Sequence, residues 1–426
     1  MVDMLQNSGC SGVFINSQVP SLHIIMFADD VTLLNDTIGR VQAQLNVLQQ
    51  FSRNYGLKVN INKTKLMVFR NGGPLRRNEK LYFNGLLVES VTYYKYLGLI
   101  FSSRLSWSKT IKTLRQQAEK AIIAVKIICN KCGELPFNIA FHLFDTLVLP
   151  ILCYGSEIWG YQIHADIEIV HRSFCKYILG TSSHTPNSAV LGECGRLPLY
   201  THYKVRCIKF WLKIMQMGSS RYPRACYDML YSLDNAGRKT WATNIKYMLY
   251  SYGFGEVWVN QGVGDVGAFI CLFKQRVIDV ATQDWHSEIL SLPKLRTYCK
   301  FKHTLSVEAY IDVITWKRHR IALARFRCGN HRLSIERYRG VLDPSQRLCN
   351  YCAQNNVTVI EDEYHFLLIC PLYNHIRSQF PKLSTVHQNY HMFISIMQSS
   401  DEETIMQTAA YIYHSLSVHH NFNNIV

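Results

Sequence analysis

The sequence lacks several features that assign a chain to common protein classes. No basic segment followed by an apolar run stands near Met1, so we expect no secretory signal. There is no repeat of fixed period and no long low-complexity tract. The most apolar window, residues 137–155, carries His142, Asp145 and Pro150, which favours a buried helix over a membrane span.

Disulfide-rich architecture is also disfavoured. The 14 cysteines are spread irregularly over 426 residues, as expected for small buried hydrophobic residues in a reducing compartment. We therefore expect an intracellular protein, cytoplasmic or nuclear. With 48% hydrophobic and 12% aromatic residues the chain can bury a core, and its length allows about two to four domains.

Acidic residues are scarce, and the basic excess is clustered. Lys and Arg number 46 against 30 Asp and Glu, a net charge of +16. Residues 291–348 hold thirteen Lys and Arg against four acids, and residues 104–131 hold seven against one. Such a field suits a polyanion, above all nucleic acid. An anionic membrane surface is the alternative, although no lipid-anchor signal is present.

Two adjacent acids, Asp29 and Asp30, stand between apolar runs of strand-forming residues. The pattern predicts a hairpin with carboxylates at its tip. Adjacent like charges repel, and a hard divalent cation such as Mg²⁺ relieves the repulsion, as in one half of a two-metal polymerase site. A solvated turn is the plainer reading of these residues alone.

The residues that follow predict further elements in order. Caps at residues 35–37 precede apolar residues at helical spacing from Ile38 to Tyr55, and Gly56 ends that helix. A strand is expected at residues 66–69, and residues 93–101 predict a bent strand pair with Gly98 at the bend.

The ordered motifs resemble the second half of the palm of a non-LTR (LINE-type) retrotransposon reverse transcriptase. These motifs are FADD, GLKVNINKTK and YKYLGLIFS, and the later stretches VLPILCYGSEIWG, RCGNHRLSIERYRG, LCNYC and EDEYHFLLICP resemble regions downstream of the polymerase. The resemblance runs through most of the chain and is least distinctive at residues 215–290.

The resemblance implies roles for individual residues. Asp29 would bridge two Mg²⁺ (or Mn²⁺) ions with help from Asp30, and Lys63, a better match than Lys65, would lie near the leaving phosphate. Tyr96, Leu97 and Gly98 would hold the primer end, although a core strand pair looks the same in sequence. The plain alternative for Lys63 is an exposed turn lysine.

A predicted amphipathic helix at residues 109–128 would be a thumb helix along the template–primer backbone. Its basic face includes Lys112 and Arg115, with Lys120 and Lys126 further along. An ordinary solvated face is the alternative.

The chain departs from the family in one respect. A complete reverse transcriptase has a third catalytic carboxylate, a nucleotide-checking helix and a fingers domain upstream of the acidic hairpin, whereas only 28 residues precede Asp29 here, with Asp3 as their only acid. We therefore expect a truncated, inactive polypeptide or an incomplete gene prediction, with an exposed sheet edge beside the hairpin.

Near the C-terminus, Cys349-x₂-Cys352 is followed after twelve residues by His365-x₄-Cys370. Three thiolates and one imidazole are a donor set typical of closed structural Zn²⁺ sites, and a short helix between His365 and Cys370 could bring both to one face. Unrelated free thiols are the alternative. A second pair, Cys129-x₂-Cys132, lacks nearby partners and predicts buried thiols.

Arginines surround this cluster and would contact phosphates if the knuckle holds nucleic acid, as in the family. They are Arg325, Arg327, Arg332, Arg337, Arg339 and Arg347. For Gly329-Asn330-His331, which matches the family, a glycine helix cap with a polar turn is an adequate alternative.

Together these observations predict an α+β palm remnant (residues 1–103), thumb-like helices (104–180), a helical linker (181–328), a basic Cys₃His zinc-knuckle domain (329–380) and a helical tail (381–426). The expected function is that of a reverse transcriptase fragment, a nucleotidyltransferase by ancestry, whose partners would be an RNA template, a DNA primer or target and, if active, deoxynucleoside triphosphates. The alternative is a non-catalytic nucleic-acid-binding protein derived from a transposable element. The oligomeric state is not predicted.

Overall fold

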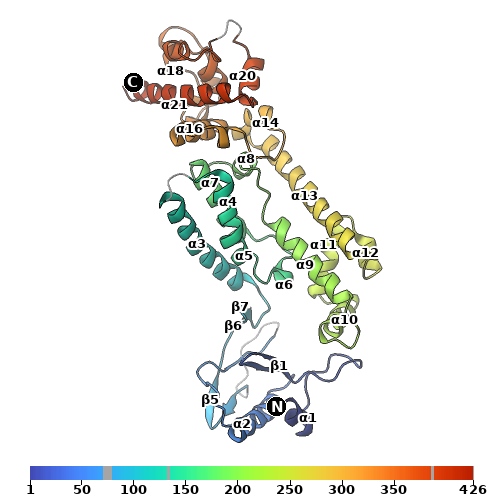
Figure 1. The fold of residues 1–426 in the computed structure, drawn as a ribbon. Coiled ribbons are helices and arrows are strands. Elements are labelled where there is room, and N and C mark those ends of the chain that lie inside the picture. Colours follow the sequence, from blue (N-terminus) through green and yellow to red (C-terminus); the bar gives the residue numbers. More distant parts are fainter. Residues whose placement is uncertain (71–78, 132–134, 385–387, 426) are drawn as a thin grey trace. The chain divides into compact units, whose positions relative to one another are not determined.

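The computed structural model describes residues 1–70, 79–131, 135–384 and 388–425 (Figure 1). Residues 71–77, where the sequence Asn71-Gly72-Gly73-Pro74 predicts a loop, and Cys132 lie outside these ranges. The chain forms two compact units. The first unit comprises Met1–Leu114, Tyr154–Ile163 and His202–Phe273, and the second comprises Arg115–Cys153, His164–Thr201 and Lys274–Val426.

All named strands of the described residues belong to the first unit, so the expected mixed α/β character is confirmed there. They form an antiparallel pair, a three-stranded sheet in the order β3-β5-β4 and a second antiparallel pair. The strands are β1 (Ile24–Phe27), β2 (Asp30–Leu33), β3 (Lys65–Leu66), β4 (Leu81–Phe83), β5 (Leu86–Ser90), β6 (Tyr93–Tyr96) and β7 (Leu99–Ser102).

The strand predicted at residues 66–69 is shorter and begins earlier than expected. β3 covers only Lys65 and Leu66, in parallel register with Glu89 and Ser90 of β5. Since β5 ends at Ser90, the residues that follow Leu66 have no strand beside them to pair with.

Helix α2 (Ile38–Asn54) confirms the predicted caps and apolar spacing. The Thr37 side chain accepts a hydrogen bond from the Arg40 backbone N–H, and Gly56 after the helix has φ of +65°. The apolar face of α2 packs on the three-stranded sheet. The buried residues of this core are Leu45, Leu66, Leu81, Phe83 and Val88.

Helix α3 (Ser108–Lys131) also matches its prediction. Its buried residues recur at helical spacing. They are Ile111, Leu114, Ala118, Ile122, Val125 and Cys129. The predicted apolar side of this helix is therefore the side that enters the core, and its basic residues lie outside.

The chain beyond residue 103 is helical, as expected, with only isolated β-bridges among the described residues. None of the described helices is both long and apolar enough to cross a bilayer. The remaining helices of the first unit are α1 (Val2–Asn7), α6 (Ser156–Trp159), α9 (Tyr200–Met215), α10 (Tyr222–Asn235), α11 (Trp241–Ser251), α12 (Gly255–Val259) and the first part of α13 (Val266–Ser291).

The second unit is built from short and long helices around aromatic side chains. Phe144 and Phe174, for example, are fully buried and stack with ring centroids 5.0 Å apart. Helices of this unit are α4 (Phe137–Leu143), a π-helix (Phe144–Val148), α5 (Leu149–Leu152), α7 (Ala165–Leu179), α8 (Asn187–Glu193), α14 (Tyr298–Phe301), α15 (Tyr310–Val313), α16 (Lys317–Arg327), α17 (Ser334–Arg337), α18 (Asn350–Gln354), a π-helix (His365–Ile369), α19 (Asn374–Arg377), α20 (Tyr390–Met397) and α21 (Glu402–Ile425).

The C-terminal helix α21 packs along α16 within the second unit, where both are drawn in orange and red (Figure 1). Tyr411 of α21 is fully buried there, in contact with Phe366. The predicted helical tail is therefore integrated into the structure around the Cys/His cluster.

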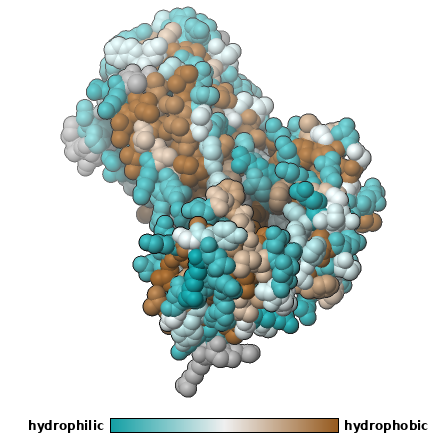
Figure 2. Space-filling view, turned by 60° about the horizontal axis from the view of Figure 1, so that its bottom comes forward, coloured by the Kyte–Doolittle hydropathy of each residue, from teal (hydrophilic) through white to brown (hydrophobic). Residues whose placement is uncertain are grey.

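The surface is mixed in character. Figure 2 shows brown, hydrophobic areas among teal, hydrophilic ones on the face that it draws. Single exposed apolar residues are normal on protein surfaces, whereas groups of them mark contact sites. One such group lies on the acidic hairpin described next.

Candidate metal centres and nucleic-acid interface

The acidic residues Asp29 and Asp30 occupy the tip of the β1–β2 hairpin, as predicted. Phe27 pairs with Asp30, so Ala28 and Asp29 form a two-residue turn, and Ala28 has φ of +52°. Both aspartates are exposed. A hairpin that presents adjacent carboxylates to solvent offers the oxygen ligands that Mg²⁺ prefers.

The hairpin is incomplete as a two-metal site within the described residues. No third carboxylate joins the two aspartates in a group of metal-ligand geometry. β1 and β2 pair only with each other there, and four of their apolar side chains are exposed. These are Ile25, Met26, Phe27 and Val31. The expected exposed edge is therefore present.

Lys63 lies in the turn after α2, where its backbone N–H donates to the Asn60 carbonyl over 3.1 Å. Its side chain is exposed, while Lys65 forms an ion pair with Glu89 over 2.5 Å. The charge of Lys63 is thus the freer of the two. No hydrogen bond or ion pair among the described residues links Lys63 to the hairpin aspartates.

Tyr96, Leu97 and Gly98 form the end of β6 and its turn into β7, which confirms the predicted bend. Leu97 and Gly98 have φ of +47° and +82°, and the Leu97 carbonyl accepts a hydrogen bond from the Tyr154 hydroxyl over 2.9 Å. A Cβ on Gly98 would approach the Tyr154 ring to 2.9 Å. The backbone angle favours glycine, and a larger residue would have to displace the Tyr154 ring. This sheet is separate from the acidic hairpin.

The basic face of α3 contains both a residue held in ion pairs and exposed residues without an ion pair to any described residue. Arg115 donates to Glu119 over 2.8 Å and to Asp166 over 2.7 Å, so its charge is balanced inside the protein. Lys112 and Lys120 are exposed and form no ion pair with any described residue. Lys112 thus fits a phosphate contact better than Arg115 does.

The arginines near the cluster also divide, and the structure corrects the expectation for two of them. Arg327 is buried in ion pairs with Glu193 and Glu308, and Arg347 is buried with its guanidinium on backbone carbonyls. Neither reaches a phosphate from there. Arg325 and Arg332 are exposed, although Arg325 Nε donates to the Gly180 carbonyl over 2.7 Å.

The predicted zinc ligands Cys349, Cys352, His365 and Cys370 come together and are all buried. Their ligand atoms lie within 4.8 Å of one another. Cys349 Sγ is 3.9 Å from Cys370 Sγ, and Cys352 Sγ is 3.5 Å from His365 Nε2. Tetrahedral Zn²⁺ with ordinary bond lengths would require about 3.8 Å between sulfurs and about 3.6 Å from sulfur to nitrogen. The set therefore fits zinc.

Local structure explains how the second ligand pair converges. Five residues advance about 1.4 turns of an α-helix, which would separate the side chains of His365 and Cys370 around the axis. Residues His365–Ile369 instead form a π-helix, and the Cys370 N–H donates to the His365 carbonyl over 2.8 Å. The wider turn brings both ligands to one side. The predicted helix is thus present, in π form.

The thiols of this cluster influence one another. The hydrogen bond with the Cys370 thiol lowers the pKa of Cys349 to about 4, whereas burial raises the pKa of Cys352 to about 11. His365 Nδ1 has no hydrogen-bond partner among the described residues. A metal-binding thiol must be a thiolate, and the lowered pKa of Cys349 favours that form.

Three acidic residues before His365 were not predicted as site residues, and each forms hydrogen bonds with the segments around the Cys/His cluster. Glu361 accepts hydrogen bonds from the Ser334 hydroxyl and from His419 of α21. Asp362 accepts from the His365 backbone N–H over 2.8 Å. Glu363 has the partners described next. The run of three acids directly before the His365 ligand was the signal in the sequence.

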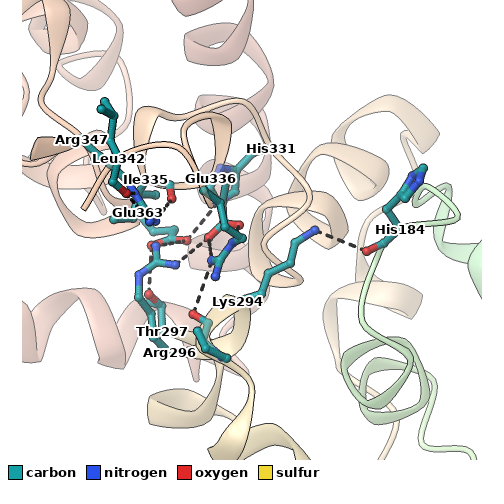
Figure 3. Close-up of polar contacts among 12 residues, drawn as sticks. His184, Lys294, Arg296, Thr297, His331, Ile335, Glu336, Leu342, Arg347 and Glu363 are labelled. Atoms are coloured by element: carbon teal, nitrogen blue, oxygen red, sulfur yellow. Dashed lines mark hydrogen bonds and ion pairs between the residues drawn. The ribbon is translucent and has the colours of Figure 1, made fainter. Parts of the chain in front are cut away.

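Glu363 is buried against Arg296, His331 and Thr297 (Figure 3). Figure 3 shows Arg296 between Glu363 and Glu336. Burial alone would raise the pKa of Glu363, but the hydrogen bond from His331 and the charge of Arg296 lower it to about 2. The carboxylate is therefore charged at neutral pH.

The structure also shows the role of the Gly329-Asn330-His331 motif. Gly329 follows α16 with φ of +64°, and Asn330 exchanges hydrogen bonds with Ser182. His331 binds Glu363 over 3.0 Å. The motif joins α16 to its surroundings, in accord with the helix-cap interpretation.

Comparisons with known proteins show which protein family part of the chain matches. Residues 8–101 match the family described as reverse transcriptase (RNA-dependent DNA polymerase). A putative uncharacterized transposon-derived protein of Caenorhabditis elegans is 28% identical over 162 residues, which is 37% of this chain and 56% of that protein.

Two further relatives carry more specific descriptions. The RNA-directed DNA polymerase from mobile element jockey of Drosophila melanogaster is 23% identical over 143 residues, 32% of this chain and 15% of that protein. The retrovirus-related Pol polyprotein from type-1 retrotransposable element R1 of Nasonia vitripennis is 25% identical over 148 residues, 32% of this chain and 39% of that protein. No solved structure matches the chain.

The segment with the acidic hairpin is thus of the reverse transcriptase family, and the resemblance to the enzymes of non-LTR retrotransposons is confirmed. This chain spans between 15% and 56% of the length of these relatives.

Proposed function

We propose that this chain is a nucleic-acid-binding portion of a non-LTR retrotransposon reverse transcriptase. The observation that carries the proposal is the exposed Asp29-Asp30 pair at a hairpin tip inside the matched segment. RNA template and DNA primer or target are the corresponding partners. The open basic residues Lys112, Arg325 and Arg332 would contact their phosphates.

In this proposal Asp29 and Asp30 contribute ligands to Mg²⁺ or Mn²⁺. Such ions activate the primer hydroxyl and stabilise charge on the triphosphate of the incoming nucleotide. Lys63 would lie near that triphosphate, and the turn at Tyr96, Leu97 and Gly98 would hold the primer end. The hydrogen bond from the Tyr154 hydroxyl to the Leu97 carbonyl helps to position this turn, as a primer-holding backbone would require.

Cys349, Cys352, His365 and Cys370 would hold a structural Zn²⁺ ion. The donor types, the burial and the two short ligand distances support this assignment. Zinc there would fix α18 and the π-helix against α21, which carries Tyr411 and His419 to the same region.

We further propose that the chain alone is inactive as a polymerase. Two hairpin carboxylates without a third in the described residues hold two divalent ions poorly, and the apolar residues of the hairpin lack a cover. A non-catalytic nucleic-acid-binding role is accordingly the second candidate, favoured by the same missing carboxylate.

Two measurements on the full chain test these statements. Fluorescence anisotropy with a labelled RNA–DNA primer–template should show binding that weakens steeply as salt rises. Absence of binding at low salt would reject the proposed function under both candidates.

Primer extension with Mg²⁺ or Mn²⁺ tests the proposed inactivity of the chain. We expect no extension by the chain alone. Extension that Asp29→Ala abolishes would contradict the proposed inactivity and establish a working polymerase site. Glu119→Gln, a change on the surface of α3, serves as the control because it leaves the hairpin untouched.

A further inference from the structure

Trp316 stands directly before α16 and is 72% exposed. Four other tryptophans are buried. They are Trp159, Trp211, Trp258 and Trp285. An indole has a large apolar surface whose exposure is unfavourable, so an open tryptophan marks a contact site when its surroundings hold it in place.

The surroundings of Trp316 do hold it. One side of the indole stacks on His319, with centroids 5.8 Å apart and planes inclined by 22°. His319 in turn contacts the Tyr413 ring of α21 at 5.0 Å. Burial lowers the pKa of His319, which favours the neutral imidazole as a support for the indole ring. The exposed fraction leaves the rest of the indole open.

Two cationic residues follow Trp316 in the sequence. Lys317 and Arg318 are exposed and form no ion pair with any described residue. Thr315, Lys317 and Arg320 also line a cavity of about 320 Å³. That volume lies at the lower end of the range of ligand pockets.

Tyr177 of α7 and Asn130 of α3 also line the cavity, and the Tyr177 hydroxyl donates a hydrogen bond to Asn130 Oδ1 over 3.1 Å. Lys126 Nζ lies 4.6 Å from the Tyr177 ring centroid and adds another positive charge. Asp312 is the acidic residue of the lining. Most of the lining is apolar, and its charged residues are Lys317, Arg320 and Asp312.

We infer that Trp316 and the two cations that follow it bind single-stranded nucleic acid, with a base stacked on the indole and the adjoining phosphates on Lys317 and Arg318. The inference rests on the proposed function and assigns it a site. A base presents a free face for stacking only when it is unpaired, and an aromatic platform in a cationic groove is how proteins hold single strands. The residues that follow Trp316 are the exposed cations Lys317 and Arg318, which suit the phosphates of a nucleic acid.

The test is binding of the full chain to labelled 12-nucleotide oligo(dT), oligo(rU) and a DNA duplex, followed by anisotropy. Stacking of one base on an aromatic side chain corresponds to about 5- to 150-fold in affinity. We expect Trp316→Ala to weaken binding of the single strands by that factor and to change duplex binding little. Trp316→Phe should restore most of the affinity, because the stacking surface returns.

A matched control is Tyr247→Ala, which removes an aromatic residue of α11 that is 63% exposed. It should leave single-strand binding unchanged. Lys317→Ala combined with Arg318→Ala should flatten the salt dependence of log affinity by about 1.4, since each phosphate contact with a single strand contributes about 0.7. Comparison of oligo(dT) with oligo(rU) shows which nucleic acid the site prefers.

Single-strand affinity of Trp316→Ala equal to that of the parent chain would overturn this inference and leave the proposed function standing. Failure of the parent chain to bind any of the three probes would instead reject the proposed function itself. Circular dichroism of each variant confirms that the exposed substitutions leave the fold intact.

Discussion

Replacement of Arg327 by methionine should destabilise the second unit more than any surface change. Arg327 donates to both carboxylate oxygens of Glu193, over 2.8 and 3.1 Å, and to Glu308 over 2.6 Å. Its side chain is 3% exposed and that of Glu193 is not exposed at all. Methionine replaces the volume of the side chain but not its charge.

The magnitude follows from which acid loses its partner. Glu308 keeps an ion pair with Lys302, whereas Glu193 would be left buried without a cation. Removal of one partner from a buried pair destabilises a protein by about 3–5 kcal/mol. That loss corresponds to an increase of about 10² to a few thousand-fold in the equilibrium for local opening.

Hydrogen exchange of the α16 amides, read by mass spectrometry, measures that opening equilibrium. Arg318→Met, in the same helix but exposed, is the matched control and should change the opening free energy by less than about 0.5 kcal/mol. Addition of Glu193→Gln to Arg327→Met should recover part of the loss, because the uncompensated charge disappears. Exchange in Arg327→Met within a factor of five of the parent would refute the reasoning.

Three further outcomes are expected. Cys352→Ser should reduce bound zinc, measured by metal analysis, from about one ion per chain to near none. Cys271→Ser, which changes an exposed cysteine outside the cluster, should retain the zinc. Equal zinc contents in the two variants would reject the Cys₃His assignment. Gly98→Ala should destabilise the β6–β7 turn by more than about 1 kcal/mol, measured by hydrogen exchange, because alanine is strained at φ of +82° and would press on Tyr154. Gly218→Ala, where no atom lies within 4 Å of the added Cβ, should have little effect. Equal exchange in the two variants would contradict the turn geometry. The pKa of Glu363, about 2, lies below its unfolded value near 4.5, so the stability that its charge contributes is complete above pH 4.5 and is lost as the pH falls toward 2. The difference in unfolding free energy between the parent and Glu363→Gln should therefore shrink by about 3 kcal/mol over that interval. A difference that stays constant with pH would exclude the ion pair as its source.

Local pattern in the sequence predicted those elements that depend on neighbours in the chain. The caps and apolar spacing of α2, the buried stripe of α3 and the two hairpin turns follow from residues a few positions apart. The Cys/His set was also predictable, because metal-ligand chemistry restricts both residue type and spacing. The length of β3 was not, since a strand ends where its partner ends.

What the sequence determined by itself is therefore the resemblance to reverse transcriptases, the acidic hairpin and the Cys/His cluster. Only the tertiary structure decided which charges are open. Arg325 and Arg327 stand two residues apart in one basic run, yet Arg325 is exposed and Arg327 is buried against Glu193, 134 positions away. Composition records that both are cations. Whether a cation meets solvent or a buried carboxylate depends on which distant segments pack beside it, because burial of a charge is tolerated only with a partner in place.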